Sequence, residues 1–291
     1  MKRFRKFLST FTAPKKDGLH FTDLIKQMIR LNANSIEIDY NYLAHTEHVL
    51  AYFLPDAPRE MINIFDEVLS AHVFGMYPNY ARIQPKIYSR ISNLPLIEEV
   101  RLLRQVHLNQ LVRVPGVVSS QSPLLPQLDM AKYNCVKCGF ILGPFMIEPS
   151  TNAVSQKEVR PNSCPECHSS GPFVINSRET MYRNYQSIKL QESPGKVPAG
   201  RLPRTKVVIL TGDLVDMCRP GDEIEVTGIF KNNFDVSLNS LNGFPVFATI
   251  IEANHVLIKT NKIIHQASSR EEIEEMQRIS ESPDIIERVI F

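Results

Sequence analysis

Four cysteines occur in two pairs of identical spacing, and thiols at this spacing bind metal ions. Cys135 and Cys138 form one Cys-x-x-Cys pair, and Cys164 and Cys167 form the other. Each pair turns two thiolates toward one point, and two pairs complete the tetrahedral shell that zinc prefers. A redox dithiol or thiols without a shared role are the alternatives, and the doubled spacing favours a metal over both. The sequence therefore predicts one zinc ion held by these four cysteines.

The predicted zinc is structural, because four cysteine ligands leave no open position for water or substrate. His168 follows the last ligand, and we expect it to remain outside the shell because four thiolates suffice. Gly139 follows the first pair, where a left-handed turn is often needed. Cys218 lies outside both pairs, and we expect it to be a small buried or half-buried residue.

Composition indicates a globular protein of more than one domain. The chain has 291 residues, of which 43% are hydrophobic and 22% charged, and it carries a formal net charge of +2. This charge does not by itself indicate a nucleic-acid binder, so such a function would depend on local patches. Five cysteines, four of them in metal-type pairs, fit a reducing compartment better than a disulfide framework. No membrane span or secretory signal is evident, so we expect no membrane partner.

Catalytic motifs are absent from the sequence. Gly195-Lys196 is followed by Val197-Pro198, which supplies no hydroxyl for Mg²⁺ and therefore makes no phosphate-binding loop. The H-E-x-x-H and G-x-S-x-G patterns are also missing. Nothing in these residues argues for catalysis.

The elements that position the cysteines change character near residue 108. Before it, apolar residues recur at helical spacing, with helices expected over 43–54 and after Pro58 and an extended piece near Ile36. After it, β-type segments lie on both sides of the cysteine pairs, with Gly116 suited to a bulge or tight bend.

This order predicts an α+β protein in which a zinc-binding subdomain is inserted into an OB-fold β-barrel. Loops are expected at 148–162 and at 191–204, and the Asn-rich segment 231–243 fits a hairpin with its turn. The expected parts are a helical subdomain at 1–107, an OB-fold at 108–128 and 177–258, a zinc-binding subdomain at 129–176 and a linker at 259–291.

Such barrels bind single strands through cationic side chains and sometimes aromatic rings. Seven cations lie near the predicted strands and loops, and any one of them also fits an ordinary surface residue. The sequence shows no dense interleaving of aromatic and basic residues, so we expect weak, sequence-independent binding. The candidates are Arg113, Arg183, Lys189 and Lys231, with Arg201, Arg204 and Lys206 as further cations.

Five segments are informative in combination, namely His107–Arg113, Tyr133–Cys138, Gln186–Gly195, Gly200–Arg204 and Pro220–Gly228. Together they resemble the N-terminal region of MCM (minichromosome maintenance) replicative helicase subunits. The resemblance covers nearly the whole chain. Two further segments, Glu47–Pro55 and Asn242–Thr249, resemble the eukaryotic subunit-two type in particular.

The resemblance implies a non-catalytic module that forms rings. Six related subunits would form a heterohexamer around DNA, and two rings would meet through their N-terminal faces. The loop at 191–204, with Gly200, Arg201, Leu202, Pro203 and Arg204, would contact the neighbouring ATPase tier. Residues 231–247 would form a hairpin that points into the channel, although its few cations argue against a strong grip on DNA.

The resemblance also implies which parts of a full-length subunit are not expected among these residues. The AAA+ ATPase domain that would bind ATP is expected beyond residue 291, and the acidic, histone-binding N-terminal extension is also expected to be missing. A nuclear location and helicase loading and activating factors as partners are implied. Two other readings are a free-standing OB/zinc single-stranded DNA-binding protein of replication or repair, and an architectural adaptor with no DNA contact.

Overall fold

The computed structural model describes residues 1–10, 12–13, 19–146, 161–198, 200–234, 247–259 and 278. Residues 1–258 form one compact unit, and the description below concerns that unit. The expected linker at 259–291, the expected loop at 148–162 and the tip of the expected hairpin lie largely or wholly outside the described residues. No helix in the described ranges is both long and apolar enough to cross a membrane.

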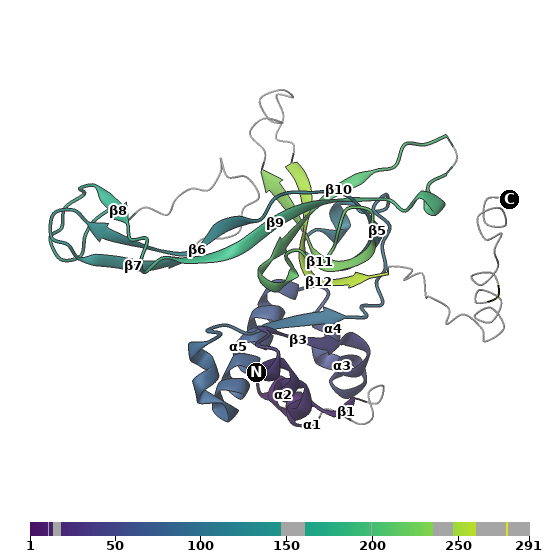
Figure 1. The fold of residues 1–291 in the computed structure, drawn as a ribbon, viewed down its shortest axis with the longest axis horizontal. Helices are drawn as coiled ribbons and strands as arrows, with labels where there is room; N and C mark the ends of the chain where they lie inside the picture. The colour runs from purple at the N-terminus through teal and green to yellow at the C-terminus, as the bar shows by residue number, and fades with distance from the viewer. Residues whose placement is uncertain are drawn as a thin grey trace. The chain divides into compact units, whose positions relative to one another are not determined.

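The first part of the chain is helical, with a short parallel pair of strands (Figure 1). Its helices pack around a core that includes Phe4, Phe65 and Leu69, all fully buried. Its elements are α1 (Lys2–Thr10), β1 (Thr12–Ala13), β2 (Leu19–His20), α2 (Phe21–Arg30), β3 (Ser35–Asp39), α3 (Tyr40–Thr46), α4 (His48–Phe53), α5 (Pro58–Met76) and β4 (Tyr88–Ser92).

Two helices occupy the place where the sequence predicts one helix over 43–54. Glu47 lies between α3 and α4 with φ −135°, outside the helical region, so the helix is interrupted there. Asp39 caps α3 by accepting a hydrogen bond from the backbone N–H of Asn41. Proline at the first position of α5 starts that helix where its missing N–H is harmless. The helical character of the region is confirmed, and only its division differs.

The second part is a closed β-barrel of five strands. β5 (Leu111–Gln121), β9 (Met181–Gln191), β10 (Thr205–Thr211), β12 (Phe247–Ile258) and β11 (Glu223–Phe234) pair in that order, and β11 pairs with β5 to close it. All pairs are antiparallel except β10 with β12. A closed five-strand barrel with this mixed pairing is the OB-fold, so the predicted fold class is confirmed. Val114, Leu190, Val226 and Ile251 lie in its core.

Two glycines allow neighbouring strands of the barrel to approach closely. A Cβ on Gly116 would lie 2.5 Å from the carbonyl oxygen of Gln191, and one on Gly228 would lie 2.5 Å from that of Glu252. The sequence predicts a bulge or tight bend at Gly116. The register shift of β5 against β9 falls instead between Val118 and Ser120, so Gly116 is required by close packing.

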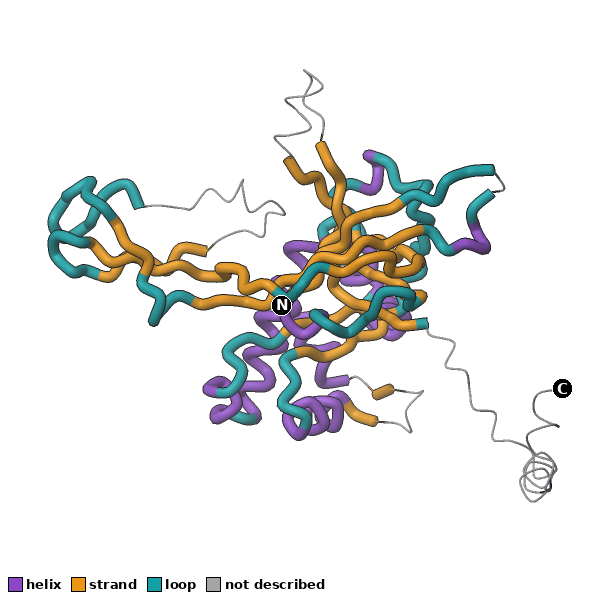
Figure 2. Tube along the Cα trace, turned by 45° about the horizontal axis from the view of Figure 1, so that its top comes forward, coloured by secondary structure: helices purple, strands orange, loops and turns teal. Residues whose placement is uncertain are grey.

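β6 (Leu125–Cys135) and β9 extend past the barrel as a two-stranded arm (Figure 1). The far end of β6 pairs with β7 (Ile141–Met146) and β8 (Phe173–Ile175). A separate small core forms there, and the ring of Tyr133 meets Phe145 edge to face at 5.8 Å. Figure 2 shows this strand-rich arm apart from the helices of the first region. The arm positions the cysteines away from the barrel core.

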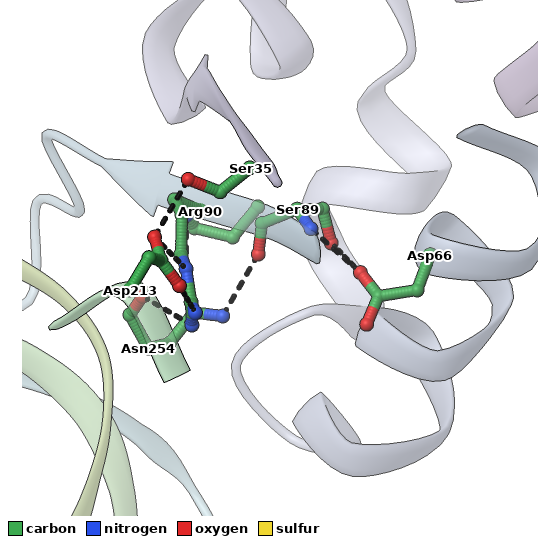
Figure 3. Close-up of polar contacts among 7 residues, drawn as sticks. Ser35, Asp66, Ser89, Arg90, Asp213 and Asn254 are labelled. Atoms are coloured by element: carbon green, nitrogen blue, oxygen red, sulfur yellow. Dashed lines mark hydrogen bonds and ion pairs between the residues drawn. The ribbon is translucent and has the colours of Figure 1, made fainter. Parts of the chain in front are cut away.

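A buried polar network joins the helical region to the barrel (Figure 3). Arg90 on β4 pairs with Asp213 and donates to the carbonyl of Asn254 at 3.0 Å. The amide of Asn254 on β12 accepts from the N–H of Ile91 at 2.7 Å and donates to the carbonyl of Ser89 at 2.9 Å. Arg90 and Asn254 are 7% and 6% exposed, so these groups depend on one another for hydrogen bonds.

Candidate metal centre and nucleic-acid interface

The two cysteine pairs form matching turns. In the first, the N–H of Gly139 donates to the carbonyl of Cys135 at 2.8 Å; in the second, the N–H of His168 donates to that of Cys164 at 3.0 Å. Gly139 has φ +75° and His168 has φ +51°, both left-handed. Each residue after a pair therefore makes the same reversal. His168 has a backbone role in the second turn, a role that Gly139 fills in the first.

The four sulfur atoms converge on one point. The Sγ atoms of Cys135 and Cys167 lie 3.6 Å apart, those of Cys138 and Cys164 lie 3.5 Å apart, and all four lie within 4.8 Å of one another. A tetrahedral ion with metal–sulfur bonds of about 2.3 Å needs sulfurs about 3.8 Å apart. The four thiols are thus placed to hold one metal ion, and no described His or carboxylate joins the group.

Hydrogen bonds favour the thiolate form at Cys135 and Cys167, whereas burial and the neighbouring thiols raise the pKa of Cys138 to about 12. The backbone N–H groups of Cys138 and Lys137 lower the pKa of Cys135 to about 6. Ser169 lowers the pKa of Cys167, because its hydroxyl lies 3.1 Å from that sulfur. Cys218, the cysteine outside the two pairs, is buried in the barrel core, as the sequence predicts.

Three of the four cations predicted to contact DNA form ion pairs in the structure. Arg113 donates to Glu225, which is 3% exposed, and to the carbonyl of Leu94 at 3.2 Å. Lys231 pairs with Glu252. The pairing neutralises these charges where they stand, so each cation has a structural role.

Arg183 and Lys189 lie on the same strand, β9. Arg183 lies 3.5 Å from Asp129 and donates to the side-chain oxygen of Gln127 at 3.0 Å. Lys189 is exposed, and within the described residues it forms no ion pair. The structure does not bring the four cations together into one patch by any contact among the described side chains.

The loop at 192–204 is anchored at its base. Glu192, 7% exposed, accepts from Arg101 at 3.2 and 3.0 Å and from the N–H of Arg204 at 3.0 Å. Arg101 also donates to the carbonyl of Leu202 at 3.0 Å. These contacts lower the pKa of Glu192, the hydrogen bond from Arg101 contributing most. Of the predicted loop residues, Gly200, Arg201, Leu202, Pro203 and Arg204 are all exposed.

The anchor is a feature that sequence reasoning missed. Arg101 and Glu192 are 91 positions apart in the chain, so spacing gives no sign of their pairing. A cavity of about 70 Å³ lies beside the pair and is lined also by Pro115, Ser193 and Pro198. The base of the loop is fixed by these bonds, and its described residues from Gly200 to Arg204 are exposed.

Comparison with known proteins follows the same division of the chain. Residues 1–93 match the family model described as MCM N-terminal domain, and residues 99–234 match the MCM OB domain. Together the two models span most of the chain, and their boundary falls between the helical region and the barrel.

Curated relatives match along the full chain. It is 52% identical to DNA replication licensing factor Mcm2 of Drosophila melanogaster and 54% identical to DNA replication licensing factor mcm2 of Xenopus laevis, in each case over 99% of this chain and 32% of the relative. It is 25% identical to Minichromosome maintenance protein MCM of Saccharolobus solfataricus, over 99% of this chain and 41% of that protein. The chain spans about a third of the length of the Mcm2 relatives.

Proposed function

The chain belongs to the minichromosome maintenance (MCM) family, and from that premise we propose that it is the non-catalytic N-terminal module of a replicative helicase subunit of the Mcm2 type. The observation that carries the proposal is the match of 99% of the chain to replication licensing factors at 46–54% identity. The module would act in replication licensing, initiation and fork unwinding, in the nucleus. ATP would be bound by another part of the protein.

The metal is proposed to be one structural zinc ion. Four thiols without a described nitrogen or oxygen ligand are the donor set that zinc takes in closed structural sites. When bound, the ion supplies a crosslink between two turns that are far apart in sequence. Cys135, Cys138, Cys164 and Cys167 would hold it, and the small core around Tyr133 would pack against it.

The assembly is proposed to be a heterohexameric ring around DNA that meets a second ring through its N-terminal face. The proposed parts are those expected from the sequence: a helical subdomain at 1–107, an OB-fold at 108–128 and 177–258, and a zinc-binding subdomain at 129–176. The loop ending in Arg204 would contact the ATPase tier, and its anchored base and exposed tip suit that role. Helicase loading and activating factors would be further partners.

Binding to DNA by this module alone is proposed to be weak and independent of sequence. Arg113, Arg183 and Lys231 form ion pairs with carboxylates of the same chain. The net charge of the chain is only +2. Lys189 is the member of the predicted set with no described ion-pair partner. Contacts to phosphate need only charge and reach, so affinity should fall with salt and vary little among sequences.

Reconstitution tests the proposal. The full-length subunit that contains this chain would be mixed with the other MCM subunits, and the product sized by analytical ultracentrifugation on and off DNA. We expect the chain to enter a six-subunit ring and, with a photo-crosslinker at Lys189, to label the enclosed strand. A subunit that never joins a ring would contradict the proposal.

The alternative is a free-standing OB/zinc protein that binds single-stranded DNA in replication or repair. Tight binding to single strands without partners, together with no affinity for other MCM subunits, would favour it. An adaptor without DNA contact would instead join the ring and give no crosslink. The same two measurements therefore separate the three readings.

A further inference from the structure

A short segment of the barrel is bonded both to the helical region and to the arm. It is Gly212–Asp216, which follows β10 and begins with the 3-10 helix η4 (Gly212–Leu214), and we call it the strap. Its two aspartates, Asp213 and Asp216, bond to different parts of the molecule. Leu214, between them, is buried in the barrel core. Because interiors are closely packed, a shift at either end of the strap must be accommodated by the same core.

The first aspartate of the strap is bonded to the helical region. The carboxylate of Asp213 accepts a hydrogen bond from the hydroxyl of Ser35 on β3 at 2.6 Å and pairs with Arg90 on β4. Figure 3 shows both side chains meeting this carboxylate. Little water reaches Arg90, so the bond to Asp213 has few substitutes. The position of Asp213 therefore depends on how the two strands of the helical region lie on the barrel.

The second aspartate is bonded to β9 at the root of the arm, where that strand passes between barrel and arm. Tyr185 marks this point, because it pairs with Thr211 of the barrel and with Leu125 of the arm. The amide of the next residue, Gln186, donates to the carboxylate of Asp216 at 2.8 Å, and its oxygen accepts from the N–H of Asp216 at 3.0 Å. Gln186 is 1% exposed, so these bonds satisfy a buried amide.

The other strand of the arm is bonded to the same aspartate. Gln121 ends β5, just before the chain enters the arm as β6, and its amide donates to the carboxylate of Asp216 at 2.9 Å. Gln186 also donates to the carbonyl of Ser122 at 3.1 Å, and Ser122 accepts from the N–H of Ser187 at 2.9 Å. The strand that enters the arm and the strand that returns from it thus share one carboxylate at the root.

We propose that the strap makes the angle of the arm depend on the docking of the helical region. While β3 and β4 hold Asp213, the strap keeps Asp216 in place, and Asp216 fixes both strands at the root of the arm. When the helical region is displaced, Asp213 loses its partners, the bonds of Asp216 weaken, and the arm is free to pivot. A chain of hydrogen bonds through a packed segment is a physical route for such coupling.

The coupling goes beyond the proposed function. In the proposed ring, a displacement of the helical region would change the angle at which the arm meets its neighbours, and this consequence rests on the proposed function. The coupling itself belongs to the single chain. It is therefore tested without assembling a ring.

Distances between two spin labels on the single chain test the proposal. One label would replace Lys26, exposed on α2, and the other Val174, exposed on β8 at the far end of the arm. Both labels would be attached to noncanonical amino acids, so that the cysteines of the metal group are not labelled. Double electron–electron resonance then gives the distribution of distances between helical region and arm. We expect one narrow distribution for the chain with an unsubstituted strap.

Substitutions at the two ends of the strap should broaden this distribution alike. Asp216→Gly removes the carboxylate without strain, because glycine accepts the φ of +59° at this position. Asp213→Ala removes the carboxylate at the other end, and Ser35→Ala weakens that end in a milder way if the Asp213 variant does not fold. Loss of the bonds at either end should raise the population of other arm angles about fivefold or more. The double variant should add little, because both substitutions break one chain of contacts.

Two controls separate the bonds of the strap from charge and from folding. Asp216→Asn keeps Oδ1, the oxygen that accepts from both Gln121 and Gln186, and should keep the narrow distribution. Asp222→Asn removes a charge from the turn after the strap, where Asp222 accepts from the N–H of Arg219 at 2.8 Å, and should change nothing. Thermal unfolding of every variant shows whether the barrel is intact.

A second contact between the helical region and the arm supplies the competing explanation. Burial raises the pKa of Tyr88 on β4, and Asp129 of β6 raises it further, so the charge of the arm lies near this ring. Unchanged distributions in the folded Asp216 and Asp213 or Ser35 variants would overturn the proposal and assign the arm angle to packing at Tyr88. Broadening by Asp216→Gly but by neither substitution at the other end would also overturn it, because Asp216 would then support the arm alone. Neither result bears on ring assembly, so the proposed function would stand.

Discussion

Ser169 contacts both ends of the second cysteine turn. Its carbonyl accepts from the N–H of Cys164 at 3.1 Å, and its hydroxyl lies 3.1 Å from the sulfur of Cys167. The sulfur of Cys135, from the other turn, is 3.9 Å away. One side chain therefore orients thiols of both turns, which is the task of groups that support metal ligands.

Ser169→Ala should weaken metal binding without abolishing it. Loss of a supporting hydrogen bond to a ligand typically lowers metal affinity about 10-fold or more. Competition with a chromophoric chelator measures this affinity directly. Ser170→Ala is the matched control, because its side chain is exposed one residue further on. Equal affinities of the two variants would show that the hydroxyl does not support the ligand.

Cys164→Ala should release the metal and loosen the far end of the arm. A missing ligand opens the shell, and the energy of metal binding is coupled to folding. Elemental analysis should fall from about one zinc per chain to well below it, and protease should cut the arm faster. Cys218→Ala, a buried thiol outside the group, should keep the metal. A preparation of the unsubstituted chain without about one equivalent of zinc would refute the assignment.

Asp66 is a buried carboxylate whose substitution should stabilise the protein. Burial raises the pKa of Asp66. The hydrogen bonds from Ser89 lower this pKa, but they offset only part of the effect of burial. A raised folded-state pKa favours the protonated form, so its contribution to stability is present at low pH and lost as pH rises through that pKa. Asp66→Asn keeps the oxygen that accepts both bonds from Ser89 and loses the charge.

At neutral pH the Asn variant should therefore gain about 1 kcal/mol over the unsubstituted chain, and the gain should vanish toward pH 4 and below. Urea denaturation at a series of pH values measures this difference. Asp66→Ala is the comparison, because it leaves a buried N–H without an acceptor and should destabilise at every pH. A constant difference for Asp66→Asn across pH would contradict the argument.

At the scale of elements, the barrel depends on how closely β11 and β12 approach. A Cβ on Gly228 would lie 2.5 Å from the carbonyl oxygen of Glu252 and 2.8 Å from a side-chain carbon of Ile251. The added Cβ would meet backbone on one side and a core side chain on the other, so neither neighbour can move away easily. The same strands shift register between Thr227 and Gly228, so the glycine sits where the sheet bends.

Gly228→Ala should destabilise the barrel by about 2 kcal/mol or more, the usual cost of overpacking a closed interior. Gly75→Ala is the opposite control, because nothing lies within 4 Å of its added Cβ in α5. That variant should gain about 0.5–1 kcal/mol from better helix propensity. Denaturation curves that shift both variants in the same direction would contradict the packing argument.

What the sequence predicts of these elements depends on how local the signal is. The cysteine turns are local, because ligand spacing and the glycine after the first pair define them, so the metal group was predicted residue by residue. The repeat in which His168 takes the place of Gly139 could have been found by aligning the two turns. The division between α3 and α4 could not have been predicted from the sequence, since the apolar spacing continues through Glu47.

Long-range pairs left no signal that a single sequence could show. Arg113 and Arg183 satisfy the criteria for phosphate contact as residue types, yet Glu225 and Asp129 neutralise them in the fold. The strand pairing that brings these partners together is set by the whole barrel. An exposed cation such as Lys189 could be separated from the paired ones only after that pairing was known.

At the scale of the molecule, two cores are joined by one polar network. The helical core and the barrel core are each apolar, and Leu111 and Ile229 of the barrel strands pack against the helical core. Between them, Arg90 is bound to Asp213 and Asn254 (Figure 3). An unsatisfied buried group on either side costs free energy, so the network links the stability of one region to that of the other.

Arg90→Met should uncouple the two regions, because it removes the ionic partner of Asp213, which keeps only the hydrogen bond from Ser35, and the donor to the carbonyl of Asn254, while it keeps the apolar volume. Breaking one partner of a buried ion pair costs about 3 kcal/mol or more. Hydrogen exchange in increasing denaturant, followed separately for α5 and for β12, should change from one shared opening to two. Lys86→Met is the control, since that lysine is exposed and lies over the ring of Tyr88, outside the Arg90 network. If α5 and β12 still open together in Arg90→Met at nearly unchanged free energy, the apolar contacts of Leu111 and Ile229 alone couple the regions.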